Sequence, residues 1–264
     1  MKKSIISLIY CLTILFGCGE QPKKADQNIT STVVSESIDN EPELKIIPIE
    51  HATAVIEWGE ITIYIDPVGG LAAFEGQKQA DLILITDIHG DHLSIETLEA
   101  LNTQKAKIIV PKAVAEKIPI AFTPQIDVLN NGETKERYGI LVEAIPMYNL
   151  RKEALNFHTR GRGNGYVLNL GEQRIYISGD TEDIPEMRAL QNIDKAFVCM
   201  NLPYTMPVDK AAEAVLEFRP KQVYPYHYRG RPDVSDVNSF KSIINTQNKD
   251  IEVVQLDWYP KDDY

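Results

Sequence analysis

An apolar run of strand length, Asp81–Thr86, leads directly into Asp87-Ile88-His89-Gly90-Asp91-His92. The Leu-Ile-Leu-Ile centre of the run predicts a strand buried on both faces, which requires a sheet covered by further layers. Ser94 then predicts the N-cap of a helix over Ile95–Leu101. Ionisable residues at the end of a buried strand need a functional reason, because unpaired buried charge is costly. The segment therefore favours a layered fold with a polar site at its strand ends.

The remainder of the chain alternates short apolar runs with amphipathic stretches. Helices are predicted from Pro207 through Phe218 and over Val237–Ile244, with a shorter one near Lys112–Lys117. Interspersed strands and helices of this kind favour a single layered α/β domain. The other runs predicted as strands are Leu44–Ile49, Thr53–Trp58, Ile61–Ile65, Lys107–Val110, Gly139–Ile145, Gly165–Leu170, Arg174–Ser178, Ala196–Met200, Gln222–Tyr226 and Ile251–Leu256.

The N-terminus has the composition of a secretory signal. Lys2 and Lys3 precede the apolar run Ile5–Phe16, which is too short to span a membrane as a mature helix. Leu15-Phe16-Gly17-Cys18 resembles a bacterial lipoprotein cleavage box, which implies lipidation of Cys18 and a membrane anchor at the cell envelope; secretion without lipid is the alternative. We expect a signal peptide over residues 1–17, lipidated Cys18 with a flexible tether over 18–43, and the folded domain over 44–264.

Charge and cysteine content exclude two classes of protein. The net charge of −11 over 264 residues argues against nucleic-acid binding through a basic face, and no obligate protein partner is inferred. Cys11 would leave with the signal and Cys18 would carry lipid, so Cys199 stands alone. No intramolecular disulfide is therefore expected. Cys199 ends an apolar run and is interpreted as a buried strand residue.

The polar segment after Thr86 has the pattern of a metal site. Alternate residues of an extended segment point the same way, so Asp87, His89 and Asp91 can converge while His92 turns toward a neighbouring position. Imidazole and carboxylate donors together suit Zn²⁺, Mn²⁺ or iron.

Two later strands also end in an ionisable residue. Asp180 follows the strand that begins at Arg174, and His227 follows the strand that begins at Gln222. A purely structural fold gains little from burying such groups there. We therefore predict that Asp180 and His227 join the residues after Thr86 in one distributed site.

These segments together resemble the metallo-β-lactamase superfamily, in its L-ascorbate-6-phosphate lactonase-like branch. The resemblance implies an αββα sandwich of a single domain, with two divalent metals in a cleft along one edge. Zn²⁺ is the favoured ion, with Mn²⁺ or iron as alternatives. The matching segments, in family order, are Ile65–Pro67, Thr86–His92, Ala144–Asn149, Gly163–Tyr166, Gly179–Thr181 and Pro225–His227.

The resemblance also implies which residues bind metal. Asp91, His92 and His227 would hold one ion, Asp180 would bridge, and His89 would belong to the second ion.

The chain departs from the family pattern at two of these positions. Asp87 stands where the family has histidine, and His158 is the remaining histidine that could supply the last ligand. Carboxylate at Asp87 would shift the preference toward Mn²⁺ or Fe²⁺; alternatively, Asp87 only supports the ligands and one metal binds. His51 is interpreted as a structural histidine, with contact to the ligands or the substrate as the alternative.

The expected activity is hydrolysis of a small-molecule substrate: an ester, lactone or phosphoester. Metal-bound hydroxide would attack a carbonyl or phosphoryl centre, and Asp91 would orient it. Arg162 and Arg229 are candidates for an anion clamp, with solvated surface arginines as the alternative. Tyr148 and Asn149 are candidate substrate contacts; Tyr148 could stabilise an oxyanion or simply pack.

Two other classes of protein stay open. One is a non-catalytic metal- or ligand-binding protein of the envelope, in which the change at Asp87 has removed catalysis. The other is a di-iron redox protein of the same fold, although no flavin-binding segment accompanies the domain.

Overall fold

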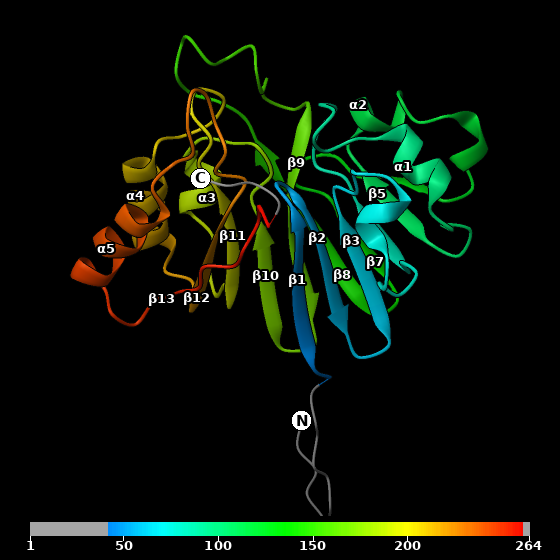
Figure 1. Cartoon of the computed structure of the whole chain (residues 1–264), viewed down its shortest axis with the longest axis horizontal. Helices are drawn as coiled ribbons and strands as arrows, with labels where there is room; N and C mark the ends of the chain where they lie inside the picture. The colour runs from blue at the N-terminus through cyan, green and yellow to red at the C-terminus, as the bar shows by residue number, and fades with distance from the viewer. Residues whose placement is uncertain (1–41, 261–264) are drawn as a thin grey trace, which may run out of the picture. The chain divides into compact units, whose positions relative to one another are not determined.

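The computed structural model describes residues 42–260, and Figure 1 shows two facing β-sheets with helices on their outer sides. The predicted signal peptide, Cys18 and nearly all of the tether lie outside the described residues. The first sheet contains, in spatial order, β1 (Leu44–Glu50), β2 (Thr53–Trp58), β3 (Ile61–Ile65), β4 (Leu82–Leu84), β5 (Lys107–Val110) and β6 (Ile126–Val128). The second sheet contains, in the same sense, β13 (Glu252–Val253), β12 (Gln222–Tyr226), β11 (Lys195–Cys199), β10 (Gln173–Ile177), β9 (Gly163–Leu170), β8 (Ile140–Met147) and β7 (Thr134–Arg137).

Alternating apolar side chains of the first sheet pack on opposite faces. In β4 and the residue after it, Leu82 and Leu84 enter the core between the sheets, while Ile83 and Ile85 enter a second core under α1 (Ile95–Ala100). This explains why the run Asp81–Thr86 is apolar at successive positions: the strand is buried on both faces. The predicted αββα sandwich is confirmed.

The helices cover the outer faces of both sheets. On the first sheet, α1 is joined by α2 (Lys112–Ala115), and the second sheet carries α3 (Pro185–Arg188), α4 (Val208–Phe218) and α5 (Val237–Gln247). Ser94 caps α1 as predicted, because its side chain accepts the backbone N–H of Thr97 at 3.1 Å. Among the described residues, no helix is long and apolar enough to cross a membrane.

Several boundaries differ from the sequence predictions. Five short elements were not predicted. They are β6, β7, α3 and two 3-10 helices, η1 (Leu71–Phe74) and η2 (Ile120–Phe122). Short elements give a weak pattern, and three of the four residues of β7 are charged. The strand expected over Ile251–Leu256 shortens to β13, whose two residues pair only with β12. Cys199 is buried and free at the end of β11, which confirms its structural interpretation.

Candidate metal centre

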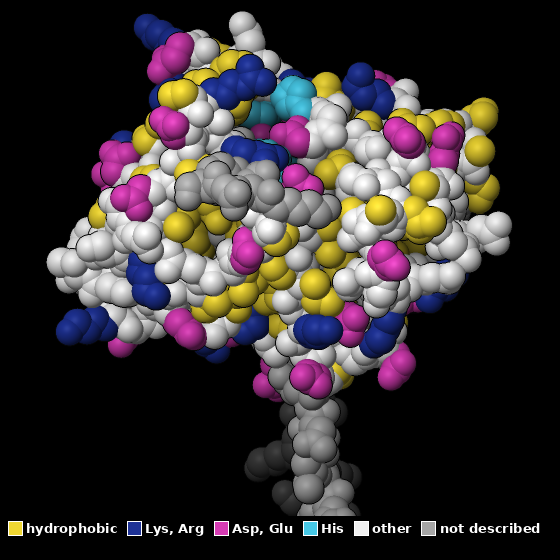
Figure 2. All heavy atoms as spheres, viewed as in Figure 1, with side chains coloured by type: hydrophobic (Ala, Val, Ile, Leu, Met, Phe, Trp, Pro, Cys, Tyr) yellow, Lys and Arg dark blue, Asp and Glu magenta, His cyan; other side chains and the backbone are white. Residues whose placement is uncertain are grey.

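Loops at one edge of the sandwich bring the candidate ligands together. The β1–β2 turn carries His51, the loop after β4 carries Asp91 and His92, and the loops after β10 and β12 carry Asp180 and His227. Figure 2 shows histidine at a hollow in the surface, with acidic and basic side chains beside it. The chain segments that supply these groups lie far apart in sequence, so the fold alone assembles the site.

Several residues at this edge have backbone in the left-handed region, which sets the direction of their side chains. Among residues 42–260, six non-glycine residues have positive φ, and three of them belong to this edge: His51 (58°), Asp66 (44°) and His227 (47°). Such backbone is strained for residues with a Cβ, and it persists where surrounding structure holds it. The strain therefore concentrates where strands end and donor side chains converge.

Three side chains, His92, Asp180 and His227, form a donor set with the dimensions of a tetrahedral metal site. Together with Asp91, which lies beside them, they are termed here the His92 site. His92 Nε2 lies 3.2 Å from His227 Nε2 and 3.4 Å from Asp180 Oδ2, and His227 Nε2 lies 3.2 Å from Asp180 Oδ1. Asp91 lies beside this set, with Oδ1 3.8 Å from His92 Nε2 and Oδ2 3.5 Å from His227 Nε2. Ligands about 2.0–2.1 Å from a tetrahedral zinc ion are separated by roughly 3.3–3.4 Å, so His92, Asp180 and His227 fit such an ion.

A buried carboxylate orients His92 from behind. Asp66 Oδ2 lies 2.8 Å from His92 Nδ1, and Asp66 also accepts the backbone N–H and the hydroxyl of Thr86, each at 2.7 Å. Nδ1 therefore donates to Asp66, which leaves the lone pair of Nε2 for the metal. Burial raises the pKa of Asp66, consistent with a group that no water reaches.

Nearby histidines keep the Asp180 carboxylate ionised. Burial alone would raise the pKa of Asp180, but His227, His92 and His158 outweigh burial and hold that pKa well below its usual range. Asp180 Oδ1 is buried without a hydrogen-bond donor, and it points toward His227 Nε2. A buried, ionised carboxylate oxygen without a donor is the kind of atom that a cation satisfies.

A second donor group, termed here the His89 site, consists of Asp87, His89 and His158. One donor atom from each lies within 4.8 Å of the others. His158 Nε2 is 3.2 Å from Asp180 Oδ2, so Asp180 lies between the two sites as the sequence resemblance implies for a bridging residue.

Asp87 has other partners within this group. Arg162 pairs with it side-on, with Nε 3.0 Å from Oδ1 and Nη2 2.8 Å from Oδ2, and His89 Nδ1 lies 2.7 Å from Oδ2. Burial raises the pKa of Asp87, but hydrogen bonds from His89 and Arg162 and the charge of His92 more than offset it.

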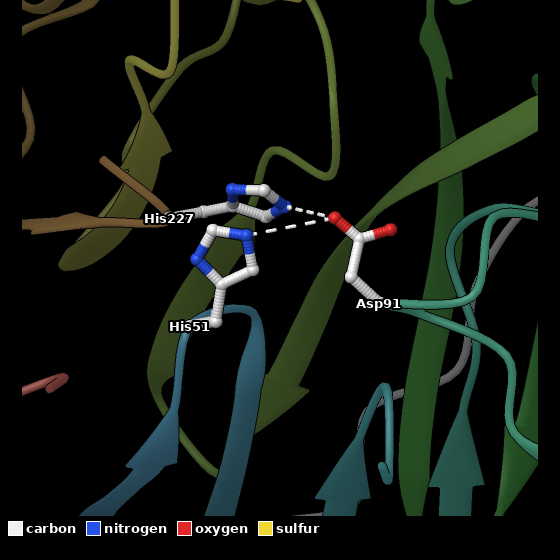
Figure 3. Close-up of side chains that lie close together, drawn as sticks. All are labelled: His51, Asp91 and His227. Carbon is white, nitrogen blue, oxygen red and sulfur yellow. Dashed lines mark ion pairs between the residues drawn. The ribbon is translucent and has the colours of Figure 1, made fainter. Parts of the chain in front are cut away.

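His51 lies against the His92 site, as Figure 3 shows with Asp91 and His227. The Tyr259 hydroxyl accepts the backbone N–H groups of Tyr228 and Arg229 and lies 2.8 Å from His51 Nδ1. Because those bonds engage its two lone pairs, the hydroxyl donates its proton to Nδ1, which places the His51 proton on Nε2. Nε2 is 3.5 Å from Asp91 Oδ2, so His51 offers Asp91 an N–H group rather than the metal a lone pair.

The protonation of His51 follows from its surroundings. Burial, with the nearby His227, lowers the pKa of His51 to about 4. The ring is therefore neutral at pH 7, and it stacks against His227 with ring centroids 3.8 Å apart. Contact with the ligands, which the sequence left as the alternative for His51, is what the structure shows.

A cavity of about 180 Å³ opens beside both sites. Phe157 and Tyr204 form an aromatic wall, with ring centroids 5.1 Å apart in an edge-to-face arrangement. Asn201 supplies a polar group in the same lining, which also includes His89 and Asp91. The cavity has room for a small reacting group and places it against the donor atoms of both sites.

The predicted substrate contacts have other partners. Tyr148 donates to Glu186 at 2.9 Å, and Asn149 donates from Nδ2 to the carbonyls of Ala154 and Tyr204 at 2.9 and 2.7 Å. None of Tyr148, Asn149, Arg162 and Arg229 lines the cavity.

The two arginines proposed as an anion clamp are engaged in the same way. Arg162 holds Asp87, and Arg229 stacks over the Tyr259 ring at 4.8 Å. The four predicted contacts, arginines included, thus support loops around the site in this structure, and whether any of them meets a substrate stays a prediction.

Sequence reasoning missed residues that the fold brings to the site. Asp66 and Thr86 lay within segments that matched the family, but no role followed from their positions alone. Tyr259 gave no signal, since a lone tyrosine near the C-terminus resembles any packed aromatic residue. Phe157 and Asn201 lie in loops whose course the sequence does not determine.

Comparison with known proteins shows the family. A family model described as a beta-lactamase superfamily domain matches residues 45–227. The chain is 30% identical over 216 residues to a protein of Pyrococcus abyssi named UPF0173 metal-dependent hydrolase, covering 78% of this chain and 94% of that relative. A relative of the same name from Archaeoglobus fulgidus is 28% identical over 225 residues, with coverage of 81% and 96%.

Two solved structures are similar to this chain. The crystal structure of a Parabacteroides distasonis protein, provisionally assigned as a metal-dependent hydrolase, is similar with a TM-score of 0.74 and 36% identity, covering 83% of this chain and 94% of that one. Igni18, a metallo hydrolase of Ignicoccus hospitalis, is similar in fold, with a TM-score of 0.67, 22% identity and coverage of 81% and 94%.

Proposed function

This chain belongs to the beta-lactamase superfamily domain family, and we propose that it is a metal-dependent hydrolase of a small ester, lactone or phosphoester. The observation that carries the proposal is the His92 site, in which His92, Asp180 and His227 have tetrahedral spacing beside a cavity. The names of the relatives, metal-dependent hydrolases, support the same class of reaction. Two imidazoles and two carboxylates suit Zn²⁺, with Mn²⁺ or iron as alternatives.

The residues of the site divide the chemical tasks. A divalent ion bound here would supply Lewis acidity and hydroxide near neutral pH. Asp91 is partly exposed to the cavity, so one of its oxygens can accept a hydrogen bond from the attacking water and orient that water toward the substrate. His51 donates to Oδ2 of Asp91 and limits its rotation. Phe157 and Tyr204 exclude bulk water from one side.

The cavity wall bears on the class of substrate. Phe157 and Tyr204 offer apolar contact, while Arg162 and Arg229 are engaged with Asp87 and Tyr259. An uncharged ester or lactone therefore suits this lining better than a phosphoester that needs an arginine clamp. Hydrolysis of phosphoesters in preference to esters would contradict this part of the proposal.

The test of function is metal-dependent turnover. The protein would be stripped with a chelator, reloaded separately with Zn²⁺, Mn²⁺ or Fe²⁺, and assayed on small esters, lactones and phosphodiesters. We expect turnover that requires metal and disappears in His227→Ala, with Lys210→Ala on the exposed side of α4 as the matched control. Metal binding without turnover across the panel would favour a binding protein, and oxygen-dependent chemistry with iron would favour a redox protein.

We also propose that Cys18 carries lipid and anchors the domain at a bacterial cell envelope. Support comes from Lys2, Lys3 and the apolar run that ends before Gly17-Cys18. Expressed in a bacterium, the full chain should fractionate with membranes and incorporate labelled fatty acid, and Cys18→Ser should do neither. Secretion of the unchanged chain into a soluble fraction without label would leave only an unlipidated signal.

A further inference from the structure

We propose that the His89 site is an acid–base site rather than a second metal site: Arg162 fixes Asp87, Asp87 orients His89, and the chain binds one metal ion, at the His92 site. The inference rests on the metal centre of the proposed function and replaces the two ions expected from sequence. It is carried by a difference in spacing between the two groups of donors.

Two donors of the His89 site, His89 and Asp87, are hydrogen-bonded to each other. His89 Nδ1 and Asp87 Oδ2 are 2.7 Å apart, the length of a charge-assisted hydrogen bond and well below a ligand–ligand separation of roughly 3.3 Å around tetrahedral zinc. Nδ1 therefore carries a proton and donates it to Asp87. In the His92 site, by contrast, the two imidazole Nε2 atoms lie 3.2 Å apart, where an ion can replace the single proton they share.

Arg162 holds the Asp87 side chain in the position from which it accepts the His89 proton. Both oxygens of Asp87 accept from the guanidinium, and the Asp87 side chain is fully buried while that of Arg162 is 17% exposed. Arg162 also donates from Nη2 to the Phe157 carbonyl, and its backbone N–H bonds to Thr159 at 3.2 Å. A divalent ion on Asp87 would lie next to a fixed positive charge, and breaking the side-on pair would leave that charge unpaired.

The hydrogen bond to Asp87 leaves the second ring nitrogen of His89 for a substrate. The His89 side chain is 39% exposed and lines the cavity together with Asp91 and Asn201. A buried carboxylate that receives Nδ1–H fixes the ring and its tautomer, so Nε2 acts as the acid–base atom. His158 supports the same region, with its ring edge-to-face on His89 at 5.2 Å and its Nε2 on Asp180.

The proton transfer balances without another reactant. The attacking water forms the new bond to the carbonyl carbon and gives up a proton, which His89 Nε2 accepts. When the carbon–oxygen bond to the leaving group breaks, the oxygen takes the electron pair and receives that proton from Nε2. Water is consumed, acid and alcohol are produced, and His89 returns to its starting state.

Metal counting tests the inference without any assay of activity. Wild type, His89→Ala and His227→Ala would be incubated with excess Zn²⁺ or Mn²⁺, desalted and analysed by mass spectrometry for bound metal, with circular dichroism to verify folding. We expect one ion in wild type, one in His89→Ala and none in His227→Ala. The Mn²⁺ form should give the electron paramagnetic resonance spectrum of an isolated ion.

Other metal counts have separate meanings. Two ions in wild type, falling to one in His89→Ala, would overturn the inference and leave the proposed hydrolase intact. No retained ion in wild type, unchanged in His227→Ala, would instead overturn the metal centre on which the proposed function stands.

Leaving groups test the acid–base role. A proton donor matters most for a poor leaving group, so His89→Ala should lose about 10²–10⁴-fold in kcat on alkyl esters and far less on nitrophenyl esters of the same acid. Arg162→Lys keeps a charge but not the side-on pair, and should show the same pattern more weakly. Equal losses on both classes of ester would show that His89 acts through the metal or the fold.

Discussion

Asp66 is buried outside the cavity, yet it fixes the state of a metal ligand. Its carboxylate accepts from His92 and twice from Thr86, so the protonated ring nitrogen of His92 faces inward and the free one faces the site. We expect Asp66→Asn to weaken metal affinity by roughly 10–100-fold, because an amide supplies one acceptor where the carboxylate supplies two. Competition with a coloured chelator measures this, with wild type as the reference; unchanged affinity would remove the orienting role.

His51 gives a second prediction at the same scale. Its Nε2–H fixes Asp91 rather than the metal, so His51→Ala should lower kcat about tenfold while the bound metal per chain stays the same. Tyr259→Phe, which removes the proton donated to Nδ1, should have a smaller effect in the same direction. Loss of the ion in His51→Ala would make His51 a ligand in its own right.

Single residues also limit what sequence predicts. The positions of Asp91, His92, Asp180 and His227 after buried strands predicted that these residues share one site, and the fold brings them together; whether they bind metal stays a prediction. The pairing of Asp87 with Arg162 could not be predicted, because the two residues are 75 positions apart and no local sequence pattern connects them. Arg162 and its neighbours suggested a substrate clamp because sequence shows charge but not the partner that neutralises it.

At the scale of elements, the close packing of β9 against β10 requires a glycine at Gly165. A Cβ on Gly165 would lie 2.8 Å from the Ser178 carbonyl and 2.9 Å from that of Ile177, on the neighbouring strand β10. Gly165→Ala should therefore cost about 1–3 kcal/mol of unfolding free energy and displace the loop that carries Asp180. Urea unfolding measures the cost. Gly90→Ala, where a Cβ meets nothing within 4 Å, is the matched control and should lose no stability.

A carboxylate joins three strands at the opposite edge. Asp194 accepts the backbone N–H of Arg174 at 2.7 Å and pairs with Lys221 at 2.6 Å, which connects the starts of β10, β11 and β12. Burial raises the pKa of Asp194, but the bonds from Lys221 and Arg174 lower it by more than burial raises it. The net shift of the pKa is therefore downward. A lowered folded pKa means that the ionised form stabilises the fold above the unfolded pKa of about 3.9, and that this contribution is lost as pH falls.

Asp194→Asn should follow that dependence. The variant should unfold a few degrees below wild type at pH 7, and the difference should shrink as pH falls through 4 toward the lowered pKa of Asp194. Thermal unfolding by circular dichroism across this range measures it. A difference that is independent of pH would assign the effect to shape rather than charge.

Elements were predictable where they are buried on both faces. The limits of β2, β3, β5 and β12 agree with the apolar runs, because continuous burial leaves an unbroken signal. β7 was missed for the opposite reason, since it lies at a sheet edge and three of its four residues are charged. Short helices such as α3 depend on tertiary packing rather than on propensity.

For the whole molecule, metal should contribute to stability. The donors of the His92 site lie within one domain and are brought together only by folding, so the ion binds the native state. At a free metal concentration 100-fold above Kd the gain is about 2.7 kcal/mol, or roughly 5–10 °C in Tm for a domain of this size. Chelation should reverse it, and His227→Ala should show no metal-dependent change in Tm.

The two sheets contribute different parts of this donor set. Asp91 and His92 extend from the sheet that contains β4, and Asp180 and His227 from the sheet that contains β10 and β12. Neither sheet alone holds a complete set, so metal affinity is a measure of the distance between the sheets. The core between them includes a gap of about 10 Å³ lined in part by Ala54 and Phe197. A larger side chain at Ala54 would increase the distance between the sheets. The affinity for the metal ion would then fall, although no ligand had been changed.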